Sequence, residues 1–70
     1  MSADLDQAIV QQRAKLLALA RRINPRLTED DVLSPADFPE LSRDPQFNYE
    51  DGILAGLISA QAVLRATAAS

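Results

Sequence analysis

The residues with the most obvious chemical potential are three consecutive acids, Glu29, Asp30 and Asp31. Carboxylate oxygens are the ligands that Mg²⁺ and Ca²⁺ prefer, but this cluster lacks the alternating ligands and the central glycine of a calcium-binding loop. Adjacent acids directly after a threonine are typical of a helix start, where they face the positive end of the helix dipole. We therefore expect these acids to begin a helix, and the sequence predicts no metal site.

Arginines near residue 21 are the best candidates for contact with an anion. Arg21, Arg22 and Arg26 lie close together in the sequence, but no aromatic residues alternate with them and the whole chain has a net charge of −3. Both features argue against a nucleic-acid surface. Compensation of a helix dipole, or pairing with the acids that follow, is the simpler role.

The chain contains no histidine and no cysteine among its 70 residues. Ser-His-Asp and Cys-His nucleophiles, thiolate zinc sites and disulfides are therefore excluded. The two glycines, Gly52 and Gly56, lie within a helical pattern and form no phosphate-binding loop. We predict no catalytic residue and no cofactor, and we expect that the protein is not an enzyme.

Charge is distributed unevenly along the chain. Residues 1–27 carry five basic and two acidic side chains, whereas residues 28–51 carry eight acidic side chains and one arginine. We expect the two segments to neutralise each other within the fold. The start of the chain is acidic, and the longest apolar stretch, residues 53–64, is too short to span a bilayer. A cytoplasmic location with no membrane or nucleic-acid partner follows as the expectation.

Two long helices are predicted, over residues 4–23 and 48–68. In the first, one face is apolar apart from a single glutamine, and Asn24-Pro25 is a stop signal. Asn48 is the expected cap of the second helix, with Asp51 three residues later. The predicted stripes are Leu5, Ile9, Gln12, Leu16, Leu19, Ala20 and Ile23 in the first helix, and Leu54, Leu57, Gln61, Leu64 and Ala68 in the second.

The linker, residues 24–47, contains all four prolines and no glycine. It is too long to be an unstructured connection in a compact domain. Thr28 to Asp31 and Ser34 to Asp37 have the residue order of short helical turns, and Asp44-Pro45 is a third possible start. We therefore predict an ordered linker that packs over one end of the two helices.

An antiparallel arrangement of the two helices, with Ile23 near Glu50, places Gln12 opposite Gln61. An unpaired buried amide costs about 1–3 kcal/mol, so this pairing satisfies both side chains. We predict Gln12 and Gln61 as a polar pair that sets the register.

The second helix has more apolar surface than one partner helix can cover, because Arg65 is its only charged residue after Asp51. A chain of this size also buries little surface and commonly needs a staple such as oligomerisation. The predicted fold is a single all-α domain over residues 1–70, a two-helix hairpin with an ordered linker that pairs into a four-helix bundle. The predicted interface residues are Gly52, Ile53, Gly56, Leu57, Ile58, Ala62 and Leu64.

Leucines, isoleucine and arginines in the first helix resemble the opening helix of the all-helical chorismate mutases. That resemblance implies a dimeric enzyme that holds a dicarboxylate with arginines. It covers about a quarter of the chain, and the other helices and polar site residues of that family have no counterpart here. The residues that carry it are Leu5, Ile9, Arg13, Leu16, Leu17 and Arg21.

The sequence thus predicts a non-catalytic protein–protein interaction module. Its partner is a second copy of the chain, as a homodimer, or another protein in a larger assembly. The alternative is a small acidic regulator, antitoxin-like or a nucleic-acid mimic, whose linker acids bind a basic partner. An enzyme is the third alternative.

Overall fold

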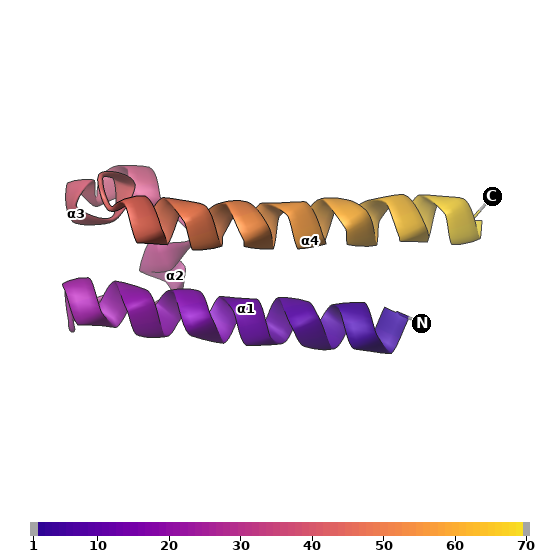
Figure 1. Ribbon diagram of the computed structural model, residues 1–70, viewed down its shortest axis with the longest axis horizontal. Helices are drawn as coiled ribbons and strands as arrows, with labels where there is room; N and C mark the ends of the chain where they lie inside the picture. Colours follow the sequence, from indigo (N-terminus) through magenta and orange to yellow (C-terminus); the bar gives the residue numbers. More distant parts are fainter. Residues whose placement is uncertain (1, 70) are drawn as a thin grey trace.

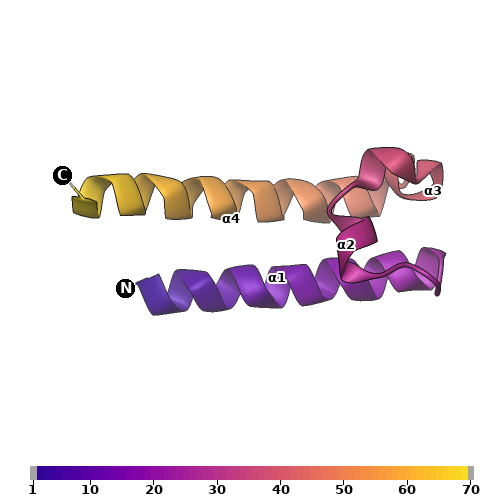
Figure 2. The same cartoon turned by 180° about the vertical axis from the view of Figure 1, so that it is seen from behind.

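A computed structural model describes residues 2–69, and every regular element in that range is helical. The predicted all-α class is therefore confirmed. The two long helices are α1 (Ser2–Ile23) and α4 (Pro45–Ala69), which lie side by side and run in opposite directions (Figure 1). The segment between them, residues 24–44, is called the strap below, and it crosses one side of the pair near one end (Figure 2).

Helix α1 forms because its interior consists of good helix formers without glycine or proline. Asp4 lies in its first turn and Arg21 and Arg22 in its last, so both ends of the helix dipole are compensated. Arg21 also donates a hydrogen bond from Nε to the carbonyl oxygen of Leu27, at 3.1 Å. This contact folds the start of the strap back against the end of α1.

The strap is a series of short helical turns. Helix α2 (Glu29–Val32) begins with a capping box, in which the backbone N–H groups of Thr28 and Asp31 each donate to the other residue's side chain. The 3₁₀ helix η1 (Pro35–Asp37) follows, and both turns were predicted. Helix α3 (Pro39–Ser42) was not predicted; it too begins with a proline in its first turn, where no backbone donor is needed.

Helix α4 begins at Pro45, three residues before the predicted start. Asp44 is its cap, because the backbone N–H of Phe47 donates to Asp44 Oδ1 at 2.7 Å. Asn48 is not the cap, and its side-chain amide instead donates to the carbonyl oxygen of Ser42 at 2.9 Å. The predicted boundary was wrong because two cap residues precede the apolar stripe and the earlier one is used.

The core lies where the strap closes over the two long helices. Phe47, Leu16 and Leu41, from α4, α1 and α3, are its largest fully buried side chains. On α4, Leu54 is the last buried side chain in the described part of the chain. The remaining core residues are Ile9, Leu19, Ala20, Leu27 and Val32.

A buried carboxylate sets the contact between α1 and α4. Glu50 is only 5% exposed, and the side-chain amide of Gln12 donates to both its carbonyl oxygen (2.8 Å) and its Oε1 (3.0 Å). Lys15 Nζ lies 3.0 Å from Glu50 Oε2. The hydrogen bond from Gln12 and the contact with Lys15 lower the pKa of Glu50 below its ordinary value of 4.5, although burial opposes them.

The predicted pairing of Gln12 with Gln61 is wrong. Gln12 bonds to Glu50, and Gln61 donates to Asp6 Oδ1 at 2.6 Å. A buried carboxylate without donors costs more than an unpaired amide, so the donors of Gln12 go to Glu50. The helices are consequently displaced along each other from the predicted register.

Glu50→Gln is expected to weaken the dependence of stability on acid pH. In the native protein the pKa of Glu50 is lowered, so the unfolded chain takes up a proton more readily as the pH falls below 4.5. The stability that Glu50 contributes is therefore present above that pH and is lost as the pH falls through its lowered value. Urea unfolding between pH 7 and 3 measures this difference, with Glu40→Gln, an exposed acid in the strap, as the control. If the free energy of unfolding fell with pH equally steeply in Glu50→Gln and in the native chain, the role given to Glu50 would be contradicted.

Candidate functional site

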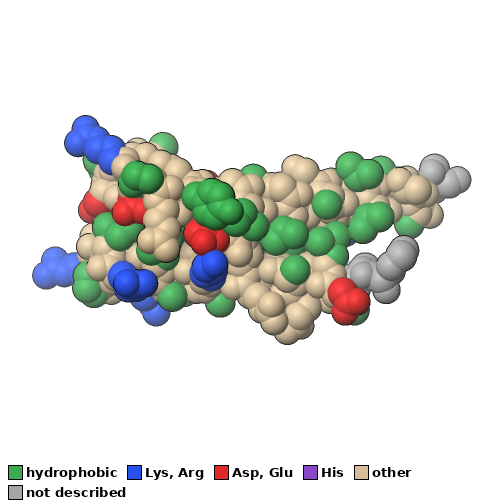
Figure 3. Space-filling view, in the orientation of Figure 1, with side chains coloured by type: hydrophobic (Ala, Val, Ile, Leu, Met, Phe, Trp, Pro, Cys, Tyr) green, Lys and Arg blue, Asp and Glu red, His purple; other side chains and the backbone are tan. Residues whose placement is uncertain are grey.

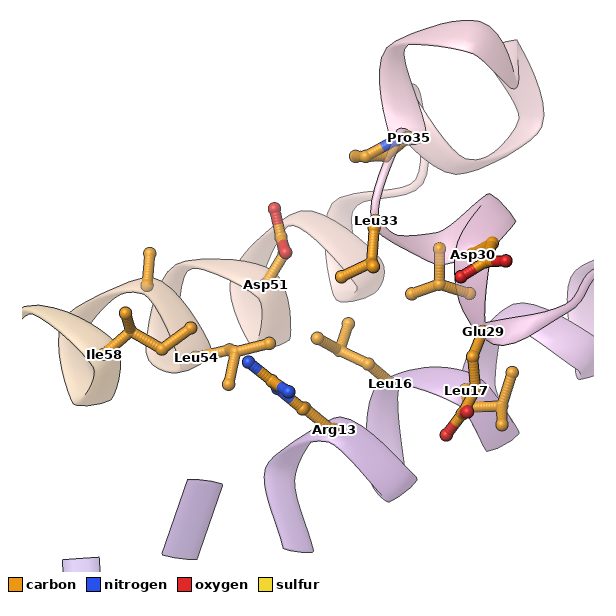
Figure 4. Close-up of a pocket in the computed structure, with 12 residues that line it drawn as sticks. Arg13, Leu16, Leu17, Glu29, Asp30, Leu33, Pro35, Asp51, Leu54 and Ile58 are labelled. Atoms are coloured by element: carbon orange, nitrogen blue, oxygen red, sulfur yellow. The ribbon is translucent and has the colours of Figure 1, made fainter. Parts of the chain in front are cut away.

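A groove of about 350 Å³ lies between α1, α2 and α4 (Figure 4). Its floor is mainly aliphatic, and its charged side chains lie around the edge. Figure 4 shows Arg13 reaching from α1 toward Leu54 and Ile58 of α4. The apolar lining consists of Leu16, Leu17, Val32, Leu33, Pro35, Leu54, Ala55 and Ile58, and the charged lining of Arg13, Glu29, Asp30 and Asp51.

The wall formed by α2 depends on its capping box. Because Thr28 starts the helix there, Val32 is directed into the core, whereas the next residue, Leu33, is 68% exposed at the groove. Glu29 and Asp30 occupy the exposed first turn of α2 and form an acidic edge. A single short helix thus supplies both an apolar and an acidic part of the site.

The groove is electronegative. Its edge carries three acids against one arginine, a net charge of −2. The one ion pair in the described part of the chain, Lys15 with Glu50, involves none of these four side chains. The acids at the groove are therefore available to a positively charged group from outside the chain.

The groove combines apolar and charged side chains. Within residues 2–69, no group of acidic side chains is arranged to hold a metal ion. The described side chains likewise include no buried polar atom without a hydrogen-bond partner. None of the helices described is long and apolar enough to cross a membrane. What the groove offers is an aliphatic floor for apolar contact and an edge that attracts positive charge.

A second, more open hollow adjoins the groove along α1. It shares Arg13, Leu17 and Glu29 with the groove and extends past Val10, which is 63% exposed. We call the side of the molecule that contains both hollows the groove side. On this side, α1, α2 and α4 all present apolar side chains.

The second half of α4 lies beyond the strap and is little buried by its own chain. From Ile58 to Ala68 every side chain is exposed except the half-buried Gln61. On the opposite side of the molecule, most charged side chains gather at the end where the strap lies, and the far half of α4 shows separate hydrophobic groups among backbone and uncharged polar atoms (Figure 3). This half of α4 therefore exposes apolar side chains along most of its length.

The seven predicted interface residues do not share one face of α4. Leu57 is half-buried and packs against the core. Ile58 lines the groove, and Ala62, one turn later, lies on the same side. Ile53 and Leu64 lie about half a turn away from the groove side, and they are 37% and 43% exposed.

The two glycines face open space. A Cβ atom placed on Gly52 or Gly56 would meet nothing within 4 Å. Close approach at these positions is therefore not required within the chain, and their predicted role in an interface stays a prediction.

Sequence reasoning did not identify the groove. Arg13, Leu33 and Asp51 come from three separate segments, and only the position of the strap brings them together. The available signal was the pair Val10 and Leu17, which widens the apolar arc of α1 beyond the stripe that one partner helix needs.

Comparison with known proteins gives no relative: no family model, curated protein or solved structure matches the chain.

Gly56→Ala is expected to raise the free energy of unfolding by about 0.5–1 kcal/mol, because alanine loses less conformational freedom than glycine in a helix and the position is open. Gly52→Ala, equally open, should behave in the same way. Urea unfolding measures both. If Gly56→Ala destabilised the protein, another chain would have to pack against this glycine. The interface would then lie on the side of α4 that carries Gly52 and Gly56.

Proposed function

We propose that the protein is a non-catalytic helical interaction module that associates with a second copy of itself into a four-helix bundle. The observation that carries this proposal is the surface that the single chain leaves exposed. The chain has 5015 Å² of accessible surface. A compact monomer of 7.6 kDa is expected to expose about 4,300 Å², so the excess is about 700 Å².

The shape of the chain agrees with this excess. Its radius of gyration is 13.5 Å and its extents are 42 × 19 × 18 Å. A compact domain of this length is expected to have a radius of gyration of about 11 Å. An elongated pair of helices becomes a normally proportioned bundle when a second pair packs along it.

The size of the excess supports a partner of similar size. Standard protein–protein interfaces bury about 800 Å² on each partner, close to the excess found here. The exposed large hydrophobic side chains include Val10, Ile53, Ile58, Val63 and Leu64 of the two long helices, and clusters of such side chains are typical of interaction surfaces. A second copy supplies an equal surface, so that one association covers both.

The groove side is the better of the two sides for this contact. There, both long helices present apolar residues, with Val10 and Leu17 on α1 and Ile58 on α4. On the opposite side, α4 presents Ile53, but α1 presents Lys15, which pairs with Glu50. On the groove side the charged side chains lie around an aliphatic floor, so the middle of the surface is apolar, as in the centre of most interfaces.

A different protein partner, in a larger assembly, would use the same apolar surface. The alternative function, an acidic regulator, would use the acids of residues 28–51 to bind a basic partner. Fewer of these acids are free than their number suggests. Asp31 and Asp44 accept capping hydrogen bonds, and Glu50 is buried in an ion pair. We therefore place self-association first.

Two matched variants test the proposal by solution mass over a concentration series. Ile58 on the groove side and Ile53 on the opposite side are 38% and 37% exposed, so neither substitution by aspartate removes a core residue. The native chain is expected at twice its mass of 7.6 kDa. Ile58→Asp should be monomeric at the same concentrations, because it places an unpaired charge in an apolar interface, whereas Ile53→Asp should remain dimeric.

A native chain that stays monomeric at every concentration would contradict self-association. Loss of the dimer in Ile53→Asp alone would place the interface on the opposite side, with Leu64. Circular dichroism on each variant verifies that helicity is kept.

A further inference from the structure

Helix α4 carries only two charged side chains after the buried Glu50, and they have opposite signs. Asp51 lies near the start of the helix, and Arg65 lies near its end. Ile58 is halfway between them, seven residues from each. Seven residues are close to two helical turns, so all three side chains project from nearly the same side of α4.

This side of α4 is the groove side. Asp51 and Ile58 both belong to the part of α4 that lines the groove, opposite α1 and α2. Arg65 is exposed, on the half of α4 that its own chain does not cover. The helix thus has an acidic, grooved half and a basic, uncovered half.

We propose that two copies pair antiparallel along α4, about a twofold axis at Ile58, so that Arg65 of each copy lies at the acidic edge of the other copy's groove, against Asp51. This inference rests on the proposed self-association and specifies its geometry. In such a pairing, residues at equal distances on either side of the axis face each other, and every contact occurs twice.

The charges select the antiparallel direction. In a parallel pairing Asp51 would face the partner's Asp51, and Arg65 the partner's Arg65, so that both ends would repel. In the antiparallel pairing Asp51 of each copy faces Arg65 of the other. The two charged contacts lie about 21 Å from each other along the helix. Like charges placed opposite each other weaken an interface, so they disfavour the parallel pairing.

The shapes agree as well. Ala55 lies between Asp51 and Ile58, and Ala62 lies between Ile58 and Arg65, so small residues flank the axis on both sides. Small residues at such positions let two helix backbones approach closely. The partner's segment around Ala62 then covers the groove, which has an aliphatic floor.

The electrostatic balance also improves. The groove edge alone has Glu29, Asp30 and Asp51 against Arg13. When Arg65 of the partner is added, three acids face two arginines, and the net charge falls from −2 to −1. Both uncovered α4 ends are covered in the same step, which accounts for the surface that the single chain leaves exposed.

A charge-swap experiment tests this register. Asp51→Arg and Arg65→Asp are each expected to raise the dimer dissociation constant about tenfold, because each creates two like-charge contacts. The double variant Asp51→Arg/Arg65→Asp restores opposite charges at both ends and should recover most of the native affinity. Sedimentation equilibrium measures the three constants, and circular dichroism reports helix content.

The matched controls are Asp37→Arg and Arg43→Asp, which make the same changes in charge at exposed strap positions outside the groove lining. They should leave the dissociation constant within about twofold of the native value. If a reversed helix charge lowers helix content, Asp51→Asn and Arg65→Gln replace the reversals, with an expected loss of about threefold each and a weaker salt dependence.

The outcomes separate the two proposals. Single variants that bind as tightly as the native chain, or a double variant no better than the singles, would overturn the register while self-association stands. A native chain that is monomeric throughout would overturn both.

Discussion

The structure depends on where the strap closes. Its short turns place Leu41 and Val32 over the ends of α1 and α4, and the core forms there around Phe47 and Leu16. A chain this small has apolar residues for only one such core. The second half of α4 therefore extends past its own cover, and the exposed surface of the molecule is a direct consequence of a core concentrated at one end.

Glu50 makes the two sides of the helix pair different. Its carboxylate is buried and held by Gln12 and Lys15, which fixes how α1 and α4 face each other and assigns a charged side chain to one side. The other side keeps the aliphatic groove. The Lys15 side chain is 60% exposed, so its ion pair with Glu50 contributes little net stability, but a register that separated Glu50 from Gln12 would leave the buried carboxylate with one donor fewer. The same polar contact thus defines both the register and the side that is left for a partner.

The sequence predicts the local elements well and their assembly poorly. Periodicity and Asn24-Pro25 give α1 to within two residues, and Thr28 with Asp31 gives the start of α2, because these signals act over one or two turns. The register was wrong because a charged residue, Glu50, is buried, and sequence patterns assign charged residues to the surface. The groove could not be foreseen because it depends on where the strap lies. Ile58 and Ala62, predicted as interface residues from the lack of charge on that helix, are exposed in the single chain, and their place in an interface stays a prediction.

The absence of cysteine makes the central claim, antiparallel pairing of α4 about Ile58, directly measurable by single-cysteine cross-linking. A residue on a twofold axis faces its own copy, so Ile58→Cys is expected to form an interchain disulfide under mild oxidation. Ala62→Cys should not, because the two copies of residue 62 would lie about 12 Å apart along the helix, beyond the reach of a disulfide. Cross-linking of both variants would indicate parallel helices, and cross-linking of neither would contradict the pairing altogether.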